Sequence, residues 1–386
     1  MFALVRAKQA LSGLLVTLLV LYIFYADALS VFTGIGFLKL LIAVFIVVAL
    51  ALYFIFLEIS VIPILSFLLM MFYIFIWDGI GSINFFLTIG FGWVFSLRPK
   101  LVKSYLWTLV LVQLALVSYE AATHQIFYKS LSSGIISSNE FEFGTDIFEE
   151  AGFRPKGLFP GTLIATSLII YTSLLFRNEP RKVLVILIMA FIVNGRLALL
   201  ISLSILILII FRRDFSIGKL RASFGSKVVL ALLTFIIGLI AVYNLYSEVA
   251  LVNLSNVLNF NSTANRGRLL SYASALSGFN DYNLYSKVFG KSEYIILGLY
   301  DRPTSPESEL LGMLLEIGIF GLLIYLIVLV KLFDTSYIFY KEGKLGFNTV
   351  IIFSIIGMIV YRHIFGNQRG SLFWFMMINE FRLKYR

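Results

Sequence analysis

Long apolar blocks, separated by short charged segments, constrain this chain more strongly than any other feature of its sequence. A helix needs about 20 apolar residues to cross the hydrocarbon of a bilayer, where each backbone N–H and C=O must be satisfied within the segment. The blocks approach this length, and only 13% of the residues are charged, against about 25% in a typical soluble domain. The sequence therefore predicts an all-α polytopic membrane protein.

The blocks predict about 12 transmembrane helices, with a range of about 11–13 because two of them are short. The predicted spans are residues 10–26, 36–57, 59–77, 80–97, 104–120, 161–176, 183–195, 197–211, 228–246, 310–330, 346–363 and 371–381. The first follows Arg6 and Lys8 but lacks a convincing small-residue cleavage site, which favours a retained helix over a signal peptide. No convincing internal repeat divides the chain, so residues 1–386 are expected to form a single membrane domain.

The basic residues predict the orientation of these helices, because Lys and Arg accumulate in cytoplasmic loops. With both termini in the cytoplasm, six short inner segments hold Arg6 and Lys8; Arg98, Lys100 and Lys103; Arg177, Arg181 and Lys182; Arg212, Arg213, Lys219, Arg221 and Lys227; Lys331, Lys341 and Lys344; and Arg382, Lys384 and Arg386. This distribution accounts for the net charge of +10 through topology. The sequence therefore predicts contact with membrane lipids and no nucleic-acid partner.

This orientation places two large loops, residues 121–160 and 247–309, on the outer face. Loops of this length are usually functional or disordered, and their aromatic residues among charged ones argue against disorder. The aromatic residues are Phe141, Phe143, Phe148, Phe153 and Phe159 in the first loop, and Tyr272, Tyr282, Tyr285, Tyr294 and Tyr300 in the second. Such rings suit a folded cap or a sugar-facing surface. The competing interpretation is anchoring at the membrane interface, where aromatic residues are enriched.

Arg196 is the strongest single candidate for function, because charged groups near membrane depth are costly. It follows Gly195 between two apolar runs that leave almost no outer loop. An arginine that snorkels to the interface is the competing explanation. The topology rule, however, does not require a basic residue on this side of the membrane.

Further basic candidates lie in the two outer loops. Arg266 and Arg268 flank a glycine ahead of an apolar helical rhythm over residues 269–276. At a helix N-terminus the two arginines can converge on one anion, because guanidinium matches phosphate oxygens and the helix dipole adds affinity. An ordinary solvated loop is the alternative. Arg154 and Lys156, in a turn with proline and glycine before the sixth span, face the same anion in this interpretation.

The second outer loop ends in an acidic, proline-containing segment that leads directly into the next span. Glu307 is the candidate general base toward a sugar hydroxyl, with Arg302 and Glu309 as candidate substrate ligands. Helix capping is the competing explanation, and we assign that role to Ser308 or Ser305. Cysteine is absent and the two histidines lack metal-ligand spacing, so no metal or cofactor is predicted.

In their order and sidedness, these elements resemble the O-antigen polymerase and O-antigen ligase superfamily over roughly residues 150–330. The matching features are the stretch from Arg154 to Gly161, Gly195-Arg196 in a helical hairpin, Arg268 before an apolar helix, Phe289-Gly290-Lys291, and the paired glycines Gly318 and Gly321. Counting back from the paired glycines, Glu307 occupies the slot that histidine holds in the ligases and that Asp or Glu often holds in the polymerases. The resemblance therefore favours a polymerase.

The resemblance implies a metal-independent membrane glycosyltransferase of the bacterial cytoplasmic (inner) membrane. It would transfer glycan of O-antigen or capsule type from undecaprenyl diphosphate onto a lipid-linked repeat unit on the outer face. Arg196 and Arg268, helped by Arg266 and Arg154, would bind the diphosphate, and Glu307 would act as the base. The implied partners are undecaprenyl-diphosphate-linked oligosaccharides, with a chain-length regulator and a flippase as further candidates. A ligase, a flippase or other transporter, and a non-catalytic scaffold remain open as alternatives.

Overall fold

The structure is a computed structural model. It describes residues 2–34, 37–56, 64–65, 68, 83–123, 155–159, 162–193, 195–211, 216–217, 220–221, 263–291, 296–297, 303–304, 308–360 and 370–384. The predicted span 228–246, most of the predicted span 59–77 and most of the predicted loop 121–160 lie outside these residues. So do the side chains of Arg196, Arg266 and Arg268, whose backbone is described.

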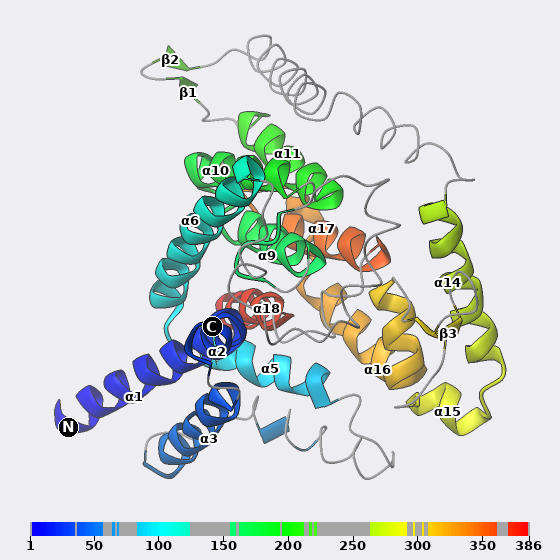
Figure 1. Ribbon diagram of the computed structural model, residues 1–386, viewed down its shortest axis with the longest axis horizontal. Coiled ribbons are helices and arrows are strands. Elements are labelled where there is room, and N and C mark those ends of the chain that lie inside the picture. The colour runs from blue at the N-terminus through cyan, green and yellow to red at the C-terminus, as the bar shows by residue number, and fades with distance from the viewer. Residues whose placement is uncertain are drawn as a thin grey trace.

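Helices make up nearly all of the described chain, as the apolar blocks predict (Figure 1). They are α1 (Phe2–Val20), α2 (Ala26–Thr33), α3 (Leu38–Phe56), α5 (Ile83–Ser96), α6 (Pro99–Thr123), α9 (Thr162–Leu175), α10 (Pro180–Ile192), α11 (Arg196–Phe211), α14 (Thr263–Asn280), α15 (Leu284–Phe289), α16 (Glu309–Leu332), α17 (Phe347–Val360) and α18 (Ser371–Lys384). A π-helical turn, Leu21–Tyr25, joins α1 to α2, and a 3-10 turn, Thr335–Tyr337, follows α16. Helices α6 and α10 begin at proline, whose fixed φ suits the first helical turn.

Among the described residues, three helical segments are long and apolar enough to cross a membrane. They are Val5–Ser30, which runs from α1 into α2, together with α6 and α16. Shorter apolar helices lie within α3, α5, α9, α11 and α17. In the described part of the chain, ten of the twelve predicted spans coincide with a helix or helix pair. The predicted helical class is confirmed, and helices suited to a membrane are present.

Three short antiparallel strand pairs interrupt the helical pattern of the described residues. They are β1 (Ser216–Ile217) with β2 (Leu220–Arg221), β3 (Ile296–Leu297) with β4 (Pro303–Thr304), and β5 (Tyr340–Lys341) with β6 (Lys344–Leu345). In the β5–β6 turn, Glu342 and Gly343 have positive φ values of 51° and 74°. Two such residues in succession form the type I′ turn that closes a tight hairpin.

Helix α9 lies at the centre of the bundle (Figure 1). Its residues from Leu168 to Tyr171 are all buried, so every side of the helix is covered, as expected for a helix that is apolar all round. Helices α5 and α18 approach each other closely at Gly92, where an added Cβ would lie 2.5 Å from the Cβ of Trp374. Small residues at such contacts allow membrane helices to gain dispersion energy through close packing.

Hydrogen bonds join the basic segments that the sequence assigns to the inner side. Arg98 Nη2 donates to the carbonyl oxygen of Gln9 at 2.6 Å. Arg382 Nη1 donates to the carbonyl oxygen of Ser96 at 3.2 Å. These bonds bring together the start of α1, the α5–α6 turn and the end of α18.

The β5–β6 hairpin joins further basic segments. The backbone N–H of Leu345 donates to Asn178 Oδ1 in the α9–α10 turn at 2.8 Å. The Tyr340 hydroxyl donates to the carbonyl oxygen of Leu208, near the end of α11, at 2.5 Å. The hairpin therefore holds the α9–α10 turn and the last turn of α11 at the same level.

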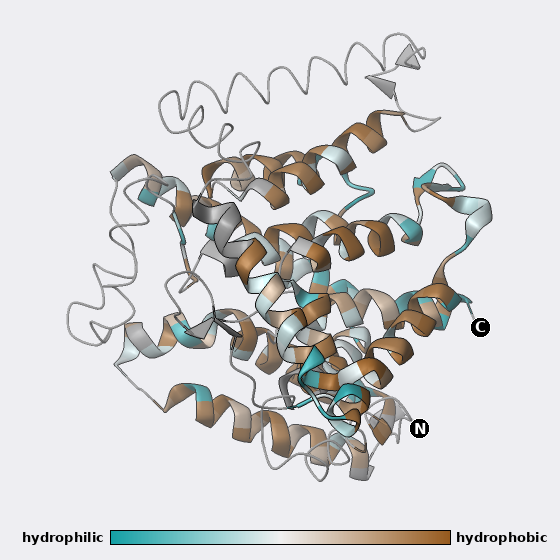
Figure 2. Cartoon of the chain, turned by 90° about the vertical axis from the view of Figure 1, so that its right-hand side faces the viewer, coloured by the Kyte–Doolittle hydropathy of each residue, from teal (hydrophilic) through white to brown (hydrophobic). Residues whose placement is uncertain are grey.

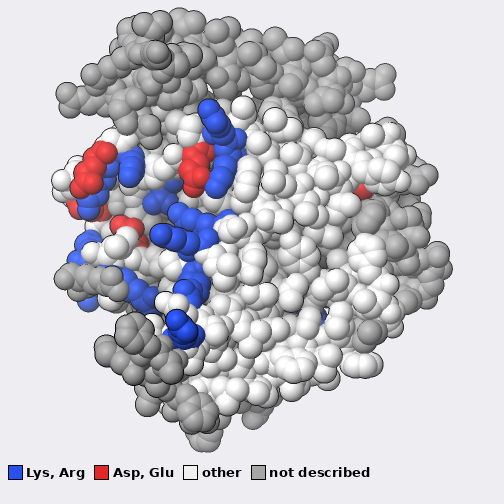
Figure 3. Space-filling model, turned by 90° about the vertical axis from the view of Figure 1, so that its left-hand side faces the viewer, with Lys and Arg blue, Asp and Glu red and all other residues white. Residues whose placement is uncertain are grey.

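Lys384 Nζ at the end of α18 donates to the carbonyl oxygen of Lys331 at the end of α16, at 2.7 Å. This bond connects the segments joined by Arg98 and Arg382 to the segment that leads into the β5–β6 hairpin. We call this end of the molecule the basic end. Figure 3 shows Lys and Arg gathered along one side of the molecule beside a broad uncharged surface, and Figure 2 shows hydrophilic loops at the same end as the C-terminus. These bonds place five of the six predicted inner segments at one end of the described chain, while most of the segment 212–227 lies outside the described residues. The location of all six segments in the cytoplasm stays a prediction.

Helix α16 is broken at Gly318, which has φ 67° and ψ −173°. The segment after α15 contacts this break, because the backbone N–H of Lys291 donates to the carbonyl oxygen of Leu315 at 2.8 Å. A Cβ at Gly318 would lie 2.5 Å from the nitrogen of Gly290. Helices α14 and α15, which belong to the predicted outer loop 247–309, thus pack on the side of α16.

Candidate functional site

Of the candidate residues that the structure describes, Lys156 and Arg196 lie at the end of the bundle opposite the basic end, which we call the far end. Helices α6 and α10 run toward the far end, and α9, α11 and α16 run back from it. The far end therefore holds the end of α6, residues 155–159 and the first residues of α9, α11 and α16. Arg154, Arg302 and Glu307 lie outside the described residues.

Four hydrogen bonds attach the described part of the loop before α9 to α6. Glu120 Oε2 accepts from the backbone N–H of Lys156 at 2.6 Å and from that of Gly157 at 2.8 Å. Gln113 Oε1 accepts from the backbone N–H of Leu158 at 2.9 Å, and its Nε2 donates to the carbonyl oxygen of Lys156 at 2.7 Å. Both side chains of α6 are fully buried. They satisfy backbone groups that would otherwise be costly to bury, and they hold Lys156 in place.

The sequence reasoning missed Gln113 and Glu120, although a signal was present. The two residues are seven apart, so they lie on one face of α6 two turns from each other. A carboxyl group inside an apolar helix points to function or to a buried partner. Gly157 completes the fit, because its φ is 61° and a Cβ there would lie 2.5 Å from Gln113 Nε2.

Arg196 is the first residue of α11. The backbone N–H of the preceding residue, Gly195, donates to the carbonyl oxygen of Ala190 at 3.2 Å and closes the end of α10. A Cβ at Gly195 would lie 2.9 Å from Thr166 Oγ1, so α11 begins against the first turns of α9. The position of Arg196 is thus beside α9, the helix that follows residues 155–159, which we call the Lys156 loop.

Helix α14 begins at Thr263, so Arg266 and Arg268 lie inside the helix rather than ahead of it. Successive residues are about 100° apart around an α-helix, which puts these two positions about 200° apart. Position 268 shares a face with Ser271 and Ala275, which are buried, and position 266 is on the opposite side. The predicted convergence of both arginines on one anion does not fit this geometry.

Ser308 occupies the N-cap position of α16, as predicted, but its side chain does not cap the helix. Its hydroxyl instead donates to the carbonyl oxygen of Met358 in the last turn of α17, at 3.3 Å. The Tyr272 hydroxyl of α14 donates to the neighbouring carbonyl oxygen of Ile359 at 3.4 Å. Both bonds satisfy carbonyl groups that the end of a helix leaves open, and they join α14, α16 and α17.

Glu309, a predicted substrate ligand, is the first residue of α16 and is only 4% exposed. Its carboxylate lies close enough to the hydroxyls of Tyr171 in α9 and Tyr325 in α16 to interact with them electrostatically. In an unbroken helix, Glu309 and Tyr325 would be about 24 Å apart. The break at Gly318 therefore folds α16 and gathers these groups beside α9. A buried carboxylate in a membrane bundle marks a functional-site candidate.

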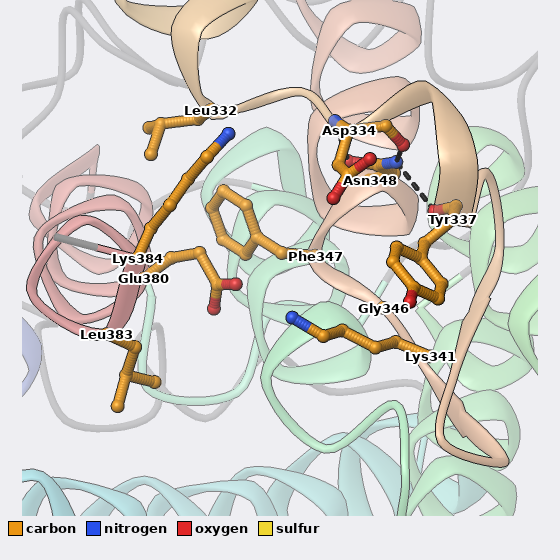
Figure 4. A pocket seen from close by; sticks show the side chains of 10 residues that line it. All are labelled: Leu332, Asp334, Tyr337, Lys341, Gly346, Phe347, Asn348, Glu380, Leu383 and Lys384. Carbon is orange, nitrogen blue, oxygen red and sulfur yellow. Dashed lines mark hydrogen bonds between the residues drawn. The ribbon is translucent and has the colours of Figure 1, made fainter. Parts of the chain in front are cut away.

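A cavity of about 100 Å³ lies at the basic end, between the ends of α16 and α18 and the start of α17 (Figure 4). Lys341 and Lys384 line it together with Asp334 and Glu380. Two ammonium groups balance two carboxylates there, so the cavity has no net charge to select a cation or an anion. None of the predicted site residues lines this cavity.

Comparisons of the chain with protein-family models, with curated proteins and with solved structures find no match. Its function is therefore inferred from its own residues and from the geometry of the far end.

Proposed function

We propose that the chain is a membrane glycosyltransferase of about twelve spans that polymerises a bacterial surface polysaccharide on the outer face of the cytoplasmic membrane. One observation carries the proposal: three elements with candidate residues adjoin α9. The loop that holds Lys156 leads into α9, the start of α11 at Arg196 abuts its first turns, and Glu309 of α16 interacts electrostatically with Tyr171 in its second half. This clustering supports a single site that combines positive charge with a carboxylate.

The proposed reaction moves the growing glycan from undecaprenyl diphosphate to a hydroxyl of the next lipid-linked repeat unit. The bond between the anomeric carbon and the diphosphate oxygen breaks, and the acceptor oxygen forms the new bond. The acceptor proton goes to Glu307. Arg196 and Arg268 neutralise the charge that develops on the departing diphosphate.

We propose supporting roles for the other candidates, based on the positions of their segments. Lys156 adds positive charge near the start of α9, because hydrogen bonds of its backbone N–H and C=O to α6 fix the point from which its side chain extends. Arg268 is preferred over Arg266 as a diphosphate ligand, since its position lies on the face of α14 that carries the buried Ser271 and Ala275. Glu309, Arg154 and Arg302 are retained as substrate ligands.

A profile of lipid-linked oligosaccharides from cells that lack the protein tests the proposal. A polymerase predicts that single-repeat lipid-linked units accumulate on the outer face and that polymer is absent. Complementation with Arg196→Ala or Glu307→Gln, at equal abundance in the membrane, should leave that profile unchanged. The matched control is Lys100→Ala at the basic end, where the side chain is exposed, and it should restore polymer.

Other profiles would refute the polymerase. Polymer that forms on its lipid carrier but is not passed to an acceptor would identify a ligase. Single repeat units that accumulate on the inner face would identify a flippase. Full-length polymer from Arg196→Ala would refute the diphosphate role of this arginine.

A further inference from the structure

Helices α14 and α15 belong to a segment that the sequence assigns to an outer loop, yet they pack beside the middle of α16, a candidate membrane span. Lys291, which follows α15, donates its backbone N–H to the carbonyl oxygen of Leu315 at 2.8 Å. The rings of Phe289 and Phe320 lie next to each other, with centroids 5.9 Å apart. Both contacts lie within three residues of the break in α16 at Gly318.

The second part of α16 indicates how deep this contact lies. From Gly318 to Leu332 the helix rises by about 21 Å, at about 1.5 Å per residue. The hydrocarbon core of a bilayer is about 30 Å thick. With Leu332 at the boundary on the side of the basic end, the contact lies about 9 Å inside the opposite boundary. The α15 contact is therefore at the depth of the outer leaflet.

The two helices present large apolar side chains that the described chain leaves open. Leu269, Leu270 and Leu276 on α14 are each about half exposed, and Leu284 on α15 is 80% exposed. Complete burial of one leucine is worth about 1.5–3 kcal/mol. Exposure of these four leucines, which we call the apolar row, to water would therefore be unfavourable by several kcal/mol relative to a location in hydrocarbon.

This apolar row continues the surface of α16. The second part of α16 exposes Leu323, Ile327 and Val330, of which Val330 is 73% exposed. Phe320, on the same helix, is in contact with α15 through Phe289. Because a spanning helix exposes such side chains to acyl chains, the adjoining residues of α15 meet the same surroundings.

The polar groups of α15 suit a location within the leaflet. Asn283 caps the helix, since its side chain accepts from the backbone N–H of Ser286 at 2.8 Å. The backbone N–H of Gly290 donates to the carbonyl oxygen of Ser286 at the other end, also at 2.8 Å. The long aliphatic stems of Lys287 and Lys291 allow their ammonium groups to reach the headgroup layer. Satisfied helix ends lower the cost of placing a short helix in lipid.

We propose that α14 and α15 form a re-entrant element that lies in the outer leaflet, with Leu269, Leu276 and Leu284 against the acyl chains of the bilayer. This inference requires that α16 spans the membrane, and it does not depend on the proposed enzymatic activity.

Spin labels at single cysteines test the proposal, because the chain has no cysteine of its own. Leu284→Cys and Leu276→Cys are labelled in the full chain and reconstituted in phospholipid vesicles. Electron paramagnetic resonance then measures collisions of each label with oxygen, which concentrates in hydrocarbon, and with a water-soluble nickel chelate. Ile327→Cys, on the exposed face of the second part of α16, serves as the lipid reference. Glu342→Cys, at the exposed tip of the β5–β6 hairpin, serves as the water reference.

Both labels on α14 and α15 should match the Ile327→Cys reference, with frequent oxygen collisions and a loss of the nickel collisions seen at Glu342→Cys. Collisions with nickel at the level of Glu342→Cys would overturn the proposal. Infrequent collisions with both probes would also overturn it, because protein and not lipid would then cover the row. Two label sites are used so that a variant without native elution in size-exclusion chromatography can be discarded.

Discussion

Gly290 and Gly318 meet backbone to backbone at the break in α16, where a Cβ on Gly318 would lie 2.5 Å from the nitrogen of Gly290. Both residues have positive φ, 83° and 67°, a conformation that glycine adopts at no steric cost. The contact holds the end of α15 against α16. The non-helical backbone of Gly318 is the bend in α16.

Gly318→Ala is expected to lower the free energy of unfolding by about 1–3 kcal/mol, because alanine would be strained at this φ and would collide with the backbone beside α15. Thermal unfolding of the purified protein in detergent measures the loss. The matched control is Gly278→Ala in α14, where a Cβ meets nothing within 4 Å. Alanine there should be neutral or stabilising by up to about 1 kcal/mol. Equal stability of the two variants would contradict the close contact.

Glu120→Ala is expected to destabilise the protein by about 1–3 kcal/mol for each buried N–H group that loses its acceptor, namely those of Lys156 and Gly157. Glu120→Gln keeps one acceptor oxygen and should lose less. Denaturation monitored by tryptophan fluorescence provides the measurement. Glu179→Ala is the control, since this residue forms a partly exposed ion pair with Lys182, and ion pairs open to solvent are worth about 0–1 kcal/mol. A smaller effect at Glu120 than at Glu179 would argue against a role of Glu120 in holding Lys156 and Gly157.

Arg268→Ala is expected to reduce polymer formation about 100-fold or more, the effect of removing one donor that stabilises charge in a transition state. Arg266→Ala should reduce it far less, because the two positions lie on opposite sides of α14. Polymer length and amount in complemented cells, at equal protein abundance, provide the comparison. A larger loss from Arg266→Ala would show that the wrong face of α14 has been assigned to the site.

Asp334 is expected to make stability depend on pH. The hydroxyl of Ser336 donates to Asp334 Oδ1 at 2.6 Å and its backbone N–H donates at 3.1 Å, and these bonds hold the pKa of Asp334 below its ordinary value. A carboxyl group with a depressed folded pKa contributes stability above its unfolded pKa of about 4. That contribution is lost as pH falls through the folded pKa.

Thermal unfolding between neutral pH and about pH 3 should therefore decline less in Asp334→Asn than in the wild type. Ser336→Ala should raise the pKa of Asp334 toward its ordinary value and also flatten the profile. Superimposable profiles for the wild type and Asp334→Asn would contradict the prediction.

The sequence by itself determined the helices and the grouping of the basic segments. Helices follow from apolar blocks because helical hydrogen bonds are local, and so the predicted spans coincide with helices wherever the chain is described. The basic segments share one end because spans of similar length alternate in direction. Arg98, Arg177 and Arg382 accordingly lie in segments that hydrogen bonds join.

Tertiary structure alone decided which side chains meet. Glu120 and Lys156 are in contact across 36 residues of chain, and no local pattern specifies such a pair. Positions 266 and 268 lie on opposite sides of α14, because this helix begins at Thr263 and not at residue 269, where the apolar pattern starts. Phe159, predicted to belong to a cap or a sugar-facing surface, is fully buried in the core. These outcomes depend on how distant segments pack. The fit between the side chains of two helices decides which residues touch, and the spacing of residues along one segment does not specify that fit.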